Sequence, residues 1–387
     1  MPASQINVVV GVGKSYNFVV QSVTIRSGSE LRQALQAARP GTQLLLAPGE
    51  FGAGYFLENI HGAPSKPIVV RAADPARPPR FSGGSVALHL ARVSWLEIHD
   101  LVIEKMSQNG LNIDDGGQYT KPSHHVTLKN LRISELPAGN RDGIKLSGID
   151  DFHVEGCHVA RWGGSGIDMV GCHRGKIVGC TFREGGDNGV QCKGGTSEVT
   201  IQRCRFEGAG LRGINLGGST GLEFFRPPVA TMPAQARYEA RNLTVEGCTF
   251  SGNDAPLAFV GVDGATVRFN TLFLPRKWAL RILQETRLPE FIACRRGVLE
   301  SNLIVFRSDS WGEGGVNIGS GTAPETFTFA RNFWWCQDRP ERSRPRLPSP
   351  ETEGRYGQDP LLGSDLKPRT GSPALKVGAH ALPPTNL

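Results

Sequence analysis

Several absences limit what this chain can be. No run of 18 apolar residues occurs among the 387, so we expect no membrane-spanning helix. Glycine does not recur at every third position, which excludes a collagen-like chain. The eight cysteines form no Cys-x-x-Cys pair, which argues against a zinc site. Charged residues make up only 20% and Met only 4 residues, whereas Gly reaches 49, a balance that favours short strands and many turns.

The charge balance is basic, with 43 Lys and Arg against 36 Asp and Glu. A net charge of +7 favours an acidic partner. The basic residues are scattered rather than clustered, so we expect an acidic polysaccharide and no nucleic acid. The first 20 residues show no basic segment followed by an apolar one, so no signal peptide is expected. The protein would be secreted or periplasmic if a signal had been removed, and cytoplasmic otherwise.

A short motif recurs along the middle of the chain: Gly followed by an apolar, a polar and an apolar residue. The best-spaced copies lie 23 or 24 residues apart, too close for a strand–helix–strand unit. A second motif keeps step with the first and supplies another short strand to each repeat. The sequence therefore predicts an all-β fold, a right-handed parallel β-helix built as a solenoid of ~23-residue coils. The clear copies of the first motif are 110–113, 143–146, 166–169, 189–192 and 213–216.

The second motif ends each time in Asn or Cys, which we expect to form an inner ladder at one turn of the coil. Stacked Asn amides would bond one another, and buried Cys would fill the same small slot as free thiols. The positions are Asn130, Cys157, Cys180, Cys204, Cys248, Asn270, Asn302 and Asn332.

We divide the chain into an N-terminal extension over 1–22, the β-helix over 23–336 and a Pro-rich tail over 337–387 that packs on the coil. Ser27-x-x-Glu30 is a capping box, and it predicts a helix over 29–39 that covers the open end of the coil. Two insertions, 217–240 and 284–296, interrupt the repeat. Long excursions from a rigid coil often build a binding cleft.

The middle residue of the first motif points outward, because its two apolar neighbours point inward. We expect it to form one surface column that binds a glycan beside the first insertion. The column is Asn112, Lys145, Asp168, Gln191, Asn215, Ala258, Arg281 and Asn317. The substrate-binding candidates are Lys145, Gln191, Asn215, Arg226, Tyr238 and Arg281. A merely solvated face would look similar.

Two segments carry a family resemblance. VTIRSGSELRQALQAARPGTQLLLAPGEF at 23–51 and PSKPIVVRA at 64–72 resemble the start of chondroitinase B-like and alginate-lyase-like polysaccharide lyases. The coil over 23–379 resembles the pectate-lyase-like superfamily. This resemblance implies β-elimination on uronic-acid polysaccharides, in which Lys or Arg removes the C5 proton and Ca²⁺ or Arg neutralises the adjacent carboxylate.

The resemblance also suggests roles for particular residues. Asp142-Gly143, Asp168 and Asn188-Gly189-Val190 match parts of the calcium-dependent pectate-lyase pattern, but Gln191 stands where that pattern has Lys. Lys193 follows on the same face, so we expect Lys193 to be the base and Arg212 the carboxylate neutraliser or acid. The expected Ca²⁺ ligands are Asp142, Asp168 and Asp187.

Two alternatives stay open. A β-helix glycoside hydrolase would need two carboxylates, for which Asp168 with Asp142 or Asp187 would serve. A glycan-binding or structural β-helix would need no catalytic group. The sequence contains no pattern that fixes the oligomeric state.

Overall fold

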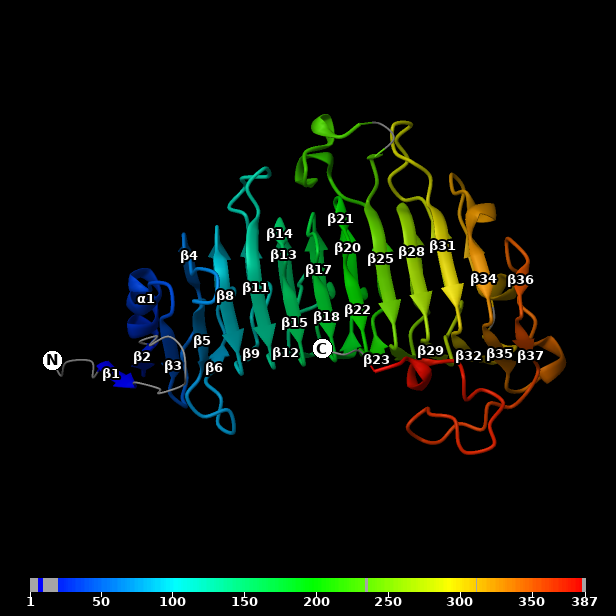
Figure 1. Ribbon diagram of the computed structural model, residues 1–387, viewed down its shortest axis with the longest axis horizontal. Helices are drawn as coiled ribbons and strands as arrows, with labels where there is room; N and C mark the ends of the chain where they lie inside the picture. The colour runs from blue at the N-terminus through cyan, green and yellow to red at the C-terminus, as the bar shows by residue number, and fades with distance from the viewer. Residues whose placement is uncertain (1–5, 10–19, 234–235, 311, 385–387) are drawn as a thin grey trace.

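The computed structural model describes residues 6–9, 20–233, 236–310 and 312–384. The chain winds into a parallel β-helix whose three sheets run along the whole molecule (Figure 1). The predicted fold class is confirmed. No helix within these ranges is long and apolar enough to cross a membrane.

The first sheet has 16 strands and faces the viewer in Figure 1. All its pairings are parallel except that of β1 with β2. Its strands are β1 (Ile6–Val9), β2 (Val20–Ile25), β3 (Gln43–Leu46), β5 (Ile68–Ala72), β8 (Ser94–His99), β11 (Ser123–Lys129), β14 (Ile149–Asp150), β15 (His153–Glu155), β18 (Lys176–Val178), β21 (Thr196–Ser197), β22 (Thr200–Gln202), β25 (Ala240–Glu246), β28 (Val262–Arg268), β31 (Arg295–Glu300), β34 (Thr328–Ala330) and β36 (Glu351–Thr352).

The second sheet has 10 strands and carries the repeated Gly motif. Its strands are β4 (Tyr55–Glu58), β7 (Leu88–Ala91), β10 (Leu111–Asp114), β13 (Ile144–Ser147), β17 (Ser165–Val170), β20 (Asn188–Lys193), β24 (Arg212–Gly217), β27 (Ala255–Val260), β30 (Leu280–Leu283) and β33 (Val316–Ile318).

The third sheet has 11 strands. They are β6 (Arg80–Ser82), β9 (Val102–Glu104), β12 (Arg132–Ser134), β16 (His158–Ala160), β19 (Thr181–Gly185), β23 (Arg205–Ala209), β26 (Thr249–Ser251), β29 (Thr271–Phe273), β32 (Leu303–Phe306), β35 (Phe333–Cys336) and β37 (Arg355–Tyr356). The short 3₁₀ turns are η1 (Leu222–Phe224), η2 (Val229–Thr231), η4 (Gly312–Gly315), η5 (Pro324–Thr326), η6 (Pro340–Arg342) and η7 (Ala379–Ala381).

One α-helix, α1 (Gly28–Ala37), occurs in the described ranges and covers the N-terminal end of the coil (Figure 1). Ser27 caps it by accepting a hydrogen bond from the Glu30 N–H at 3.3 Å. The helix ends two residues earlier than the predicted 29–39, because Pro40 disfavours helical geometry in the residue before it.

The two ends of the chain differ from the predicted division. Residues 1–5 and 10–19 of the predicted extension, with most of the segment searched for a signal peptide, lie outside the described residues. At the other end β36 and β37 add a further partial coil beyond 336. The remaining tail then runs back beneath the third sheet (Figure 1), where Ala374 and Val377 pack on Leu303 and Phe333.

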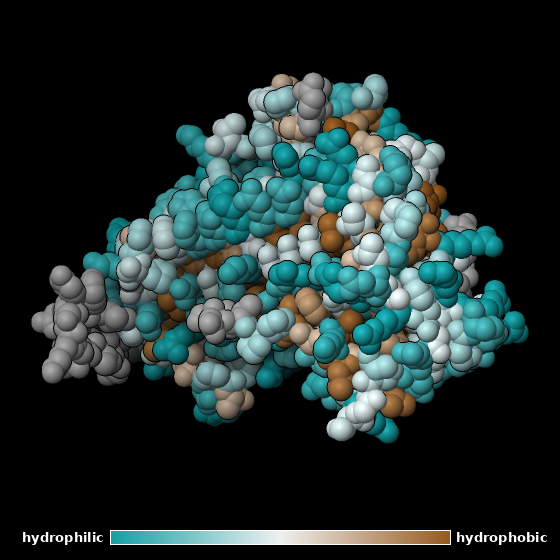
Figure 2. Space-filling model, turned by 45° about the vertical axis from the view of Figure 1, so that its right-hand side comes forward, coloured by the Kyte–Doolittle hydropathy of each residue, from teal (hydrophilic) through white to brown (hydrophobic). Residues whose placement is uncertain are grey.

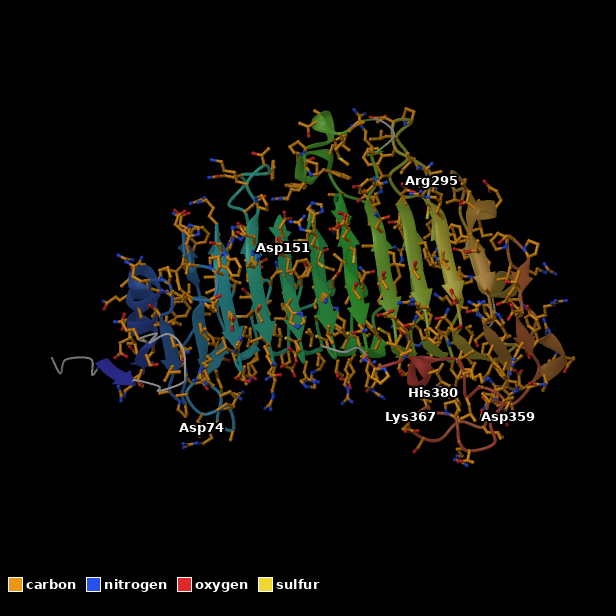
Figure 3. The ribbon with its side chains drawn as sticks, in the orientation of Figure 1. Asp74, Asp151, Arg295, Asp359, Lys367 and His380 are labelled. Atoms are coloured by element: carbon orange, nitrogen blue, oxygen red, sulfur yellow. The ribbon has the colours of Figure 1, made fainter. Side chains whose placement is uncertain are left out.

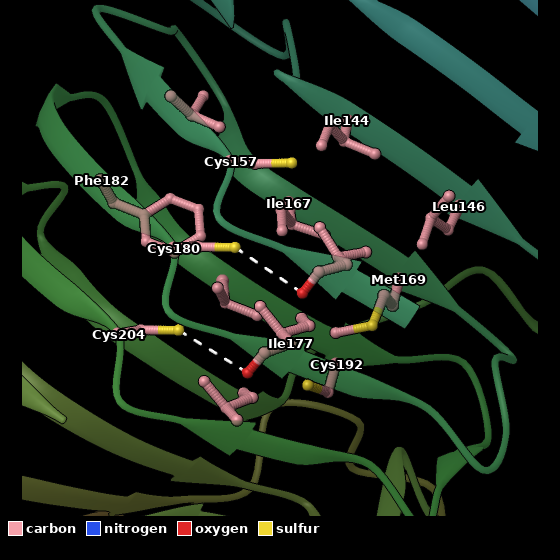
Figure 4. Close-up of a cluster of buried hydrophobic side chains, with 14 of the residues drawn as sticks. Ile144, Leu146, Cys157, Ile167, Met169, Ile177, Cys180, Phe182, Cys192 and Cys204 are labelled. Atoms are coloured by element: carbon pink, nitrogen blue, oxygen red, sulfur yellow. Dashed lines mark hydrogen bonds between the residues drawn. The ribbon is translucent and has the colours of Figure 1, made fainter. Parts of the chain in front are cut away.

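The inner ladder has two chemistries. Asn302 donates from Nδ2 to Asn332 Oδ1 at 2.9 Å and accepts from Asn270 Nδ2 at 3.0 Å. Further towards the N-terminus the slot holds buried free cysteines, and the Cys204 thiol lies 3.7 Å from the Ile177 carbonyl oxygen (Figure 4). Both kinds of side chain cover backbone groups inside the turn.

The assignment of Asn130 to this ladder is wrong by one residue. Asn130 has φ 54° and lies at the turn position that Gly156 and Gly179 fill on the next coils. Leu131, fully buried, occupies the inner slot instead. Asn tolerates the left-handed conformation that this turn requires, so Asn marks either position equally well in the sequence.

Aromatic side chains stack in the core of the third sheet. The rings of Phe182, Phe206 and Phe250 lie 4.9 and 4.7 Å apart between centroids and are nearly parallel. Each ring repeats one coil further along, so Phe206 contacts a ring on both sides.

We predict that Phe206→Ala lowers the free energy of unfolding by about 3–5 kcal/mol, because it removes the middle ring and leaves a cavity. The matched control is Phe56→Ala, whose ring is 54% exposed. It should cost less than about 1 kcal/mol. Thermal unfolding followed by circular dichroism measures both, and equal shifts would contradict the packing role of Phe206.

Candidate active site

The strand register of the second sheet aligns the predicted outward column. Lys145 pairs with Asp168, Asp168 with Gln191, and Gln191 with Asn215 on successive coils. The column continues through Ala258 to Arg281. Each step is one coil, about 4.8 Å.

A groove of about 590 Å³ lies over the C-terminal half of this column. Six of the predicted site residues line it: Asp187, Gln191, Lys193, Arg212, Asn215 and Arg281. Lys145, Asp142, Asp168, Arg226 and Tyr238 are not among the lining residues. The face drawn in Figure 2 is mainly hydrophilic, with apolar side chains in small patches.

An alternating chain of charges lies beneath the floor of the groove. Lys145 Nζ forms an ion pair with Asp168 Oδ2 and lies 3.6 Å from Asp142 Oδ2. Lys193 Nζ lies 3.4 Å from the same Asp168 oxygen. Both carboxylates are almost fully buried, with 2% of Asp142 and 1% of Asp168 exposed. Two cations therefore neutralise two buried anions, which meets the cost of burying charge.

The pKa values in this chain follow from burial and charge. Burial, reinforced by the neighbouring Asp168 carboxylate, raises the pKa of Asp142 to about 6 against the pull of Lys145. Burial opposes the charged form of Lys145, but Asp168 and Asp142 outweigh it and raise the pKa of Lys145. Asp142 therefore takes up a proton at a higher pH than an ordinary aspartate does.

Arg212 is held on the groove wall by two partners. Its Nη2 donates to Glu285 Oε1 at 2.7 Å and its Nη1 to Asn215 Oδ1 at 3.1 Å. Further along, the Arg281 guanidinium lies 4.5 Å from the centroid of the Trp278 ring. Cations from the coils of β20, β24 and β30 thus face one groove.

Sequence reasoning missed several lining residues. Lys277 and Trp278 stand just before β30, and Trp278 has the place in the repeat that Asn188 and Arg212 have at the start of β20 and β24. This shared position in the repeat could have identified Trp278 as a residue of the groove. Glu285 and Asp254 could not be identified in the same way, because their roles depend on ion pairs with Arg212 and Lys277 across coils.

The two insertions rise next to each other above the coil (Figure 1), and we call them the wall. Ser219 of the first insertion and Glu285 of the second line the groove. The segment 218–239 joins β24 to β25 and 284–294 joins β30 to β31. Phe225 and Phe291 pack edge to face at 5.4 Å between ring centroids. The fully buried Glu239 accepts hydrogen bonds from the Gly194 N–H, the Thr220 N–H and the Thr286 hydroxyl. These contacts hold the two insertions together and attach them to the coil.

Arg226 anchors the wall and does not reach the groove. Its Nε donates to Asp115 Oδ2 at 2.6 Å, and only 7% of the residue is exposed. It packs across Gly148 and Gly171, where an added Cβ would lie 2.7 and 2.3 Å from its atoms. Tyr119 covers one face of the guanidinium at 4.3 Å from the ring centroid, and Arg226 Nη1 and Nη2 donate to the Phe224 carbonyl and to Asp115 Oδ1.

Tyr238 also lies away from the groove. The Arg241 guanidinium is 5.7 Å from its ring centroid, on the side of the first sheet. Arg241 belongs to a cluster with Asp263 and Arg295, and Arg295 projects from the upper part of the first sheet in Figure 3. Tyr238 therefore faces the first sheet rather than the groove, and its position in the sequence could not show this.

The expected Ca²⁺ ligands do not fit a calcium site. Asp142 and Asp168 face lysine ammonium groups, and Asp187 is exposed on a loop. In the part of the chain that the structure describes, no three His, Cys, Asp or Glu side chains are grouped to hold a metal ion. Ca²⁺ prefers several oxygen ligands, and here cations occupy that place.

We predict that millimolar Ca²⁺ raises the melting temperature by less than about 1 °C, because a ligand stabilises only a folded state that binds it. Differential scanning fluorimetry with and without EDTA measures this. A rise of several degrees that Asp168→Asn abolishes would contradict it.

We predict that Arg226→Met destabilises the wall, because it leaves the Asp115 carboxylate buried without a partner, at a cost of about 3–5 kcal/mol. Limited proteolysis should then cut within 218–239 sooner than in the unaltered protein. The double variant Arg226→Met with Asp115→Asn also removes the unpaired carboxylate, so it should recover part of the lost stability. Unchanged resistance of Arg226→Met would contradict the anchoring role.

The comparisons with known proteins agree on the fold. The family model described as "Right handed beta helix region" matches residues 86–273. An alginate lyase from Paenibacillus sp. str. FPU-7 superposes with a TM-score of 0.54 at 18% identity, covering 76% of this chain and 99% of that one. No curated protein matches the sequence.

Two further solved structures show the range of activities on this fold. A GH136 lacto-N-biosidase from Eubacterium ramulus has a TM-score of 0.57 at 17% identity, covering 85% of this chain and 64% of that one. A rhamnogalacturonan lyase has a TM-score of 0.55 at 14% identity, covering 80% and 87%. These superpositions show a shared fold. At identities of 14 to 18% they give no conclusion about the activity of this chain. The chain therefore has the right-handed parallel β-helix fold that its repeats predict.

Proposed function

We propose that this protein is a polysaccharide lyase that cleaves an acidic, uronic-acid-containing polysaccharide by β-elimination in the groove. The observation that carries the proposal is the set of cations that line it: Lys193, Arg212, Lys277 and Arg281. A uronate polymer presents one carboxylate per sugar, and guanidinium groups bind carboxylates well. Polysaccharide lyases are also among the structures with this fold.

Lys193 and Arg212 divide the chemistry. Lys193 takes the proton at C5 of the uronate after its ammonium group has released a proton to solvent. The electron pair forms the C4=C5 double bond and the C4–O bond breaks, and the leaving oxygen takes a proton from water. Arg212 neutralises the carboxylate on which negative charge grows as the C5 proton leaves. Glu285 and Asn215 fix the guanidinium for this role.

The hydrolase alternative has less support in the geometry. Its candidate pairs are Asp168 with Asp142 or with Asp187, and both Asp142 and Asp168 are buried beside lysines. Asp187, Glu285 and Asp254 line the groove, but Glu285 and Asp254 are paired with Arg212 and Lys277. Two carboxyl groups free to protonate a glycosidic oxygen and activate water are what a hydrolase needs.

A panel of acidic polysaccharides tests the proposal. The absorbance of the unsaturated uronide in the ultraviolet marks elimination and identifies the polymer. New reducing ends without that absorbance would establish a hydrolase. Binding without either product would establish a glycan-binding protein, and both results would overturn the lyase.

We predict that Lys193→Ala lowers kcat by at least about 10²-fold, the usual contribution of a positioned base. The matched control is Lys176→Ala, which removes an exposed strand lysine from the first sheet, outside the groove. The initial rate of absorbance increase on the identified polymer measures both variants. Full turnover by Lys193→Ala would rule out Lys193 as the base.

A further inference from the structure

The amide of Gln191 has an orientation that its neighbours dictate. Gln191 Oε1 accepts from Lys193 Nζ at 3.3 Å, from Ser165 Oγ at 3.3 Å and from Asn188 Nδ2 at 3.5 Å. A lysine ammonium can only donate, so the end of the amide that faces Lys193 must be the oxygen. The three contacts leave no choice between the two ways of placing the amide.

The amide nitrogen therefore points away from Lys193. Gln191 lines the groove, and among the described residues Nε2 donates to no protein acceptor. Nε2 lies against Gly218, where an added Cβ would be only 2.8 Å from it. Because position 218 is a glycine, no side chain there covers Nε2.

Arg212 lies on the next coil beside this donor. Gln191 and Asn215 are register partners, and Arg212 Nη1 bonds Asn215 Oδ1 at 3.1 Å. An uncharged donor and a guanidinium thus face the same groove on coils about 4.8 Å apart. Lys193 lies two residues beyond Gln191 on the same face of β20.

We infer that Gln191 is a carboxylate-binding residue of the catalytic site, whose Nε2 donates to the uronate carboxylate while Lys193 removes the C5 proton. This inference rests on the proposed function. Elimination pushes charge from C5 onto the carboxylate oxygens, so a donor already aimed at them stabilises the transition state more than the bound substrate. Gln191 and Arg212 together supply the neutralisation.

Two substitutions separate this role from a merely structural one. Gln191→Glu keeps an oxygen for Lys193, Ser165 and Asn188 but removes the outward donor. Gln191→Met removes both ends of the amide without adding charge. We expect both to lower kcat/KM by about 10²-fold, the usual loss for one such donor. Gln43→Glu and Gln43→Met, on β3 of the first sheet, are the controls and should leave turnover unchanged.

Gln191→Met is the decisive variant, because it removes the donor without adding a charge beside Lys193. A loss of activity in Gln191→Glu alone would be explained by the new carboxylate next to Lys193 and would overturn the inference. Gln191→Met within about threefold of the unaltered protein would also overturn it.

The same variants distinguish this inference from the proposed function. If the unaltered protein forms no unsaturated uronide from any acidic polymer, the proposed function fails. Electrophoretic retardation in gels that contain those polymers then tests carboxylate binding alone. Weaker retardation of Gln191→Met than of the unaltered protein would support recognition of the carboxylate, and equal retardation would overturn the inference.

Discussion

Parallel backbone pairing between successive coils is the constraint on which the rest of this molecule depends. It fixes the register of every strand of the second sheet, from β4 to β33. Because side chains alternate between faces, a slip of one residue would turn the polar column into the core. The Asn ladder and the Phe182–Phe206–Phe250 stack hold that register from inside, since each side chain contacts its equivalent on the next coil.

The same register explains how charge can be concentrated beneath the groove. Stacking equivalent positions about 4.8 Å apart would place like charges together if the repeats were identical. Here Lys145, Asp168 and Gln191 alternate in sign or are neutral along the column, and Lys193 reaches back to Asp168. The charge of the two buried carboxylates is thereby neutralised, and Asp168 Oδ1 has no hydrogen-bond partner among the described residues. The charged groups that line the groove are four cations and three carboxylates.

The wall beside the groove depends on contacts that are remote in sequence. Arg226 reaches Asp115, 111 residues earlier, and Glu239 joins the first insertion to Thr286 of the second. These are buried charge contacts, which are costly to break from one side. They give a rigid edge to a groove that the regular coil alone would leave flat.

The sequence by itself determined the repeat, and with it the fold, because a Gly-apolar-polar-apolar motif every 23 or 24 residues has few other solutions. It also determined the outward column, since two-residue alternation assigns each side chain a face. Only the tertiary structure decided the rest. Arg226 and Tyr238 lie outside the groove, because an insertion does not follow the repeat and its path cannot be predicted from the period of the sequence. Asp168 forms ion pairs with Lys145 and Lys193 of the coils on either side, and ion pairs between coils depend on distances in space that the sequence does not show.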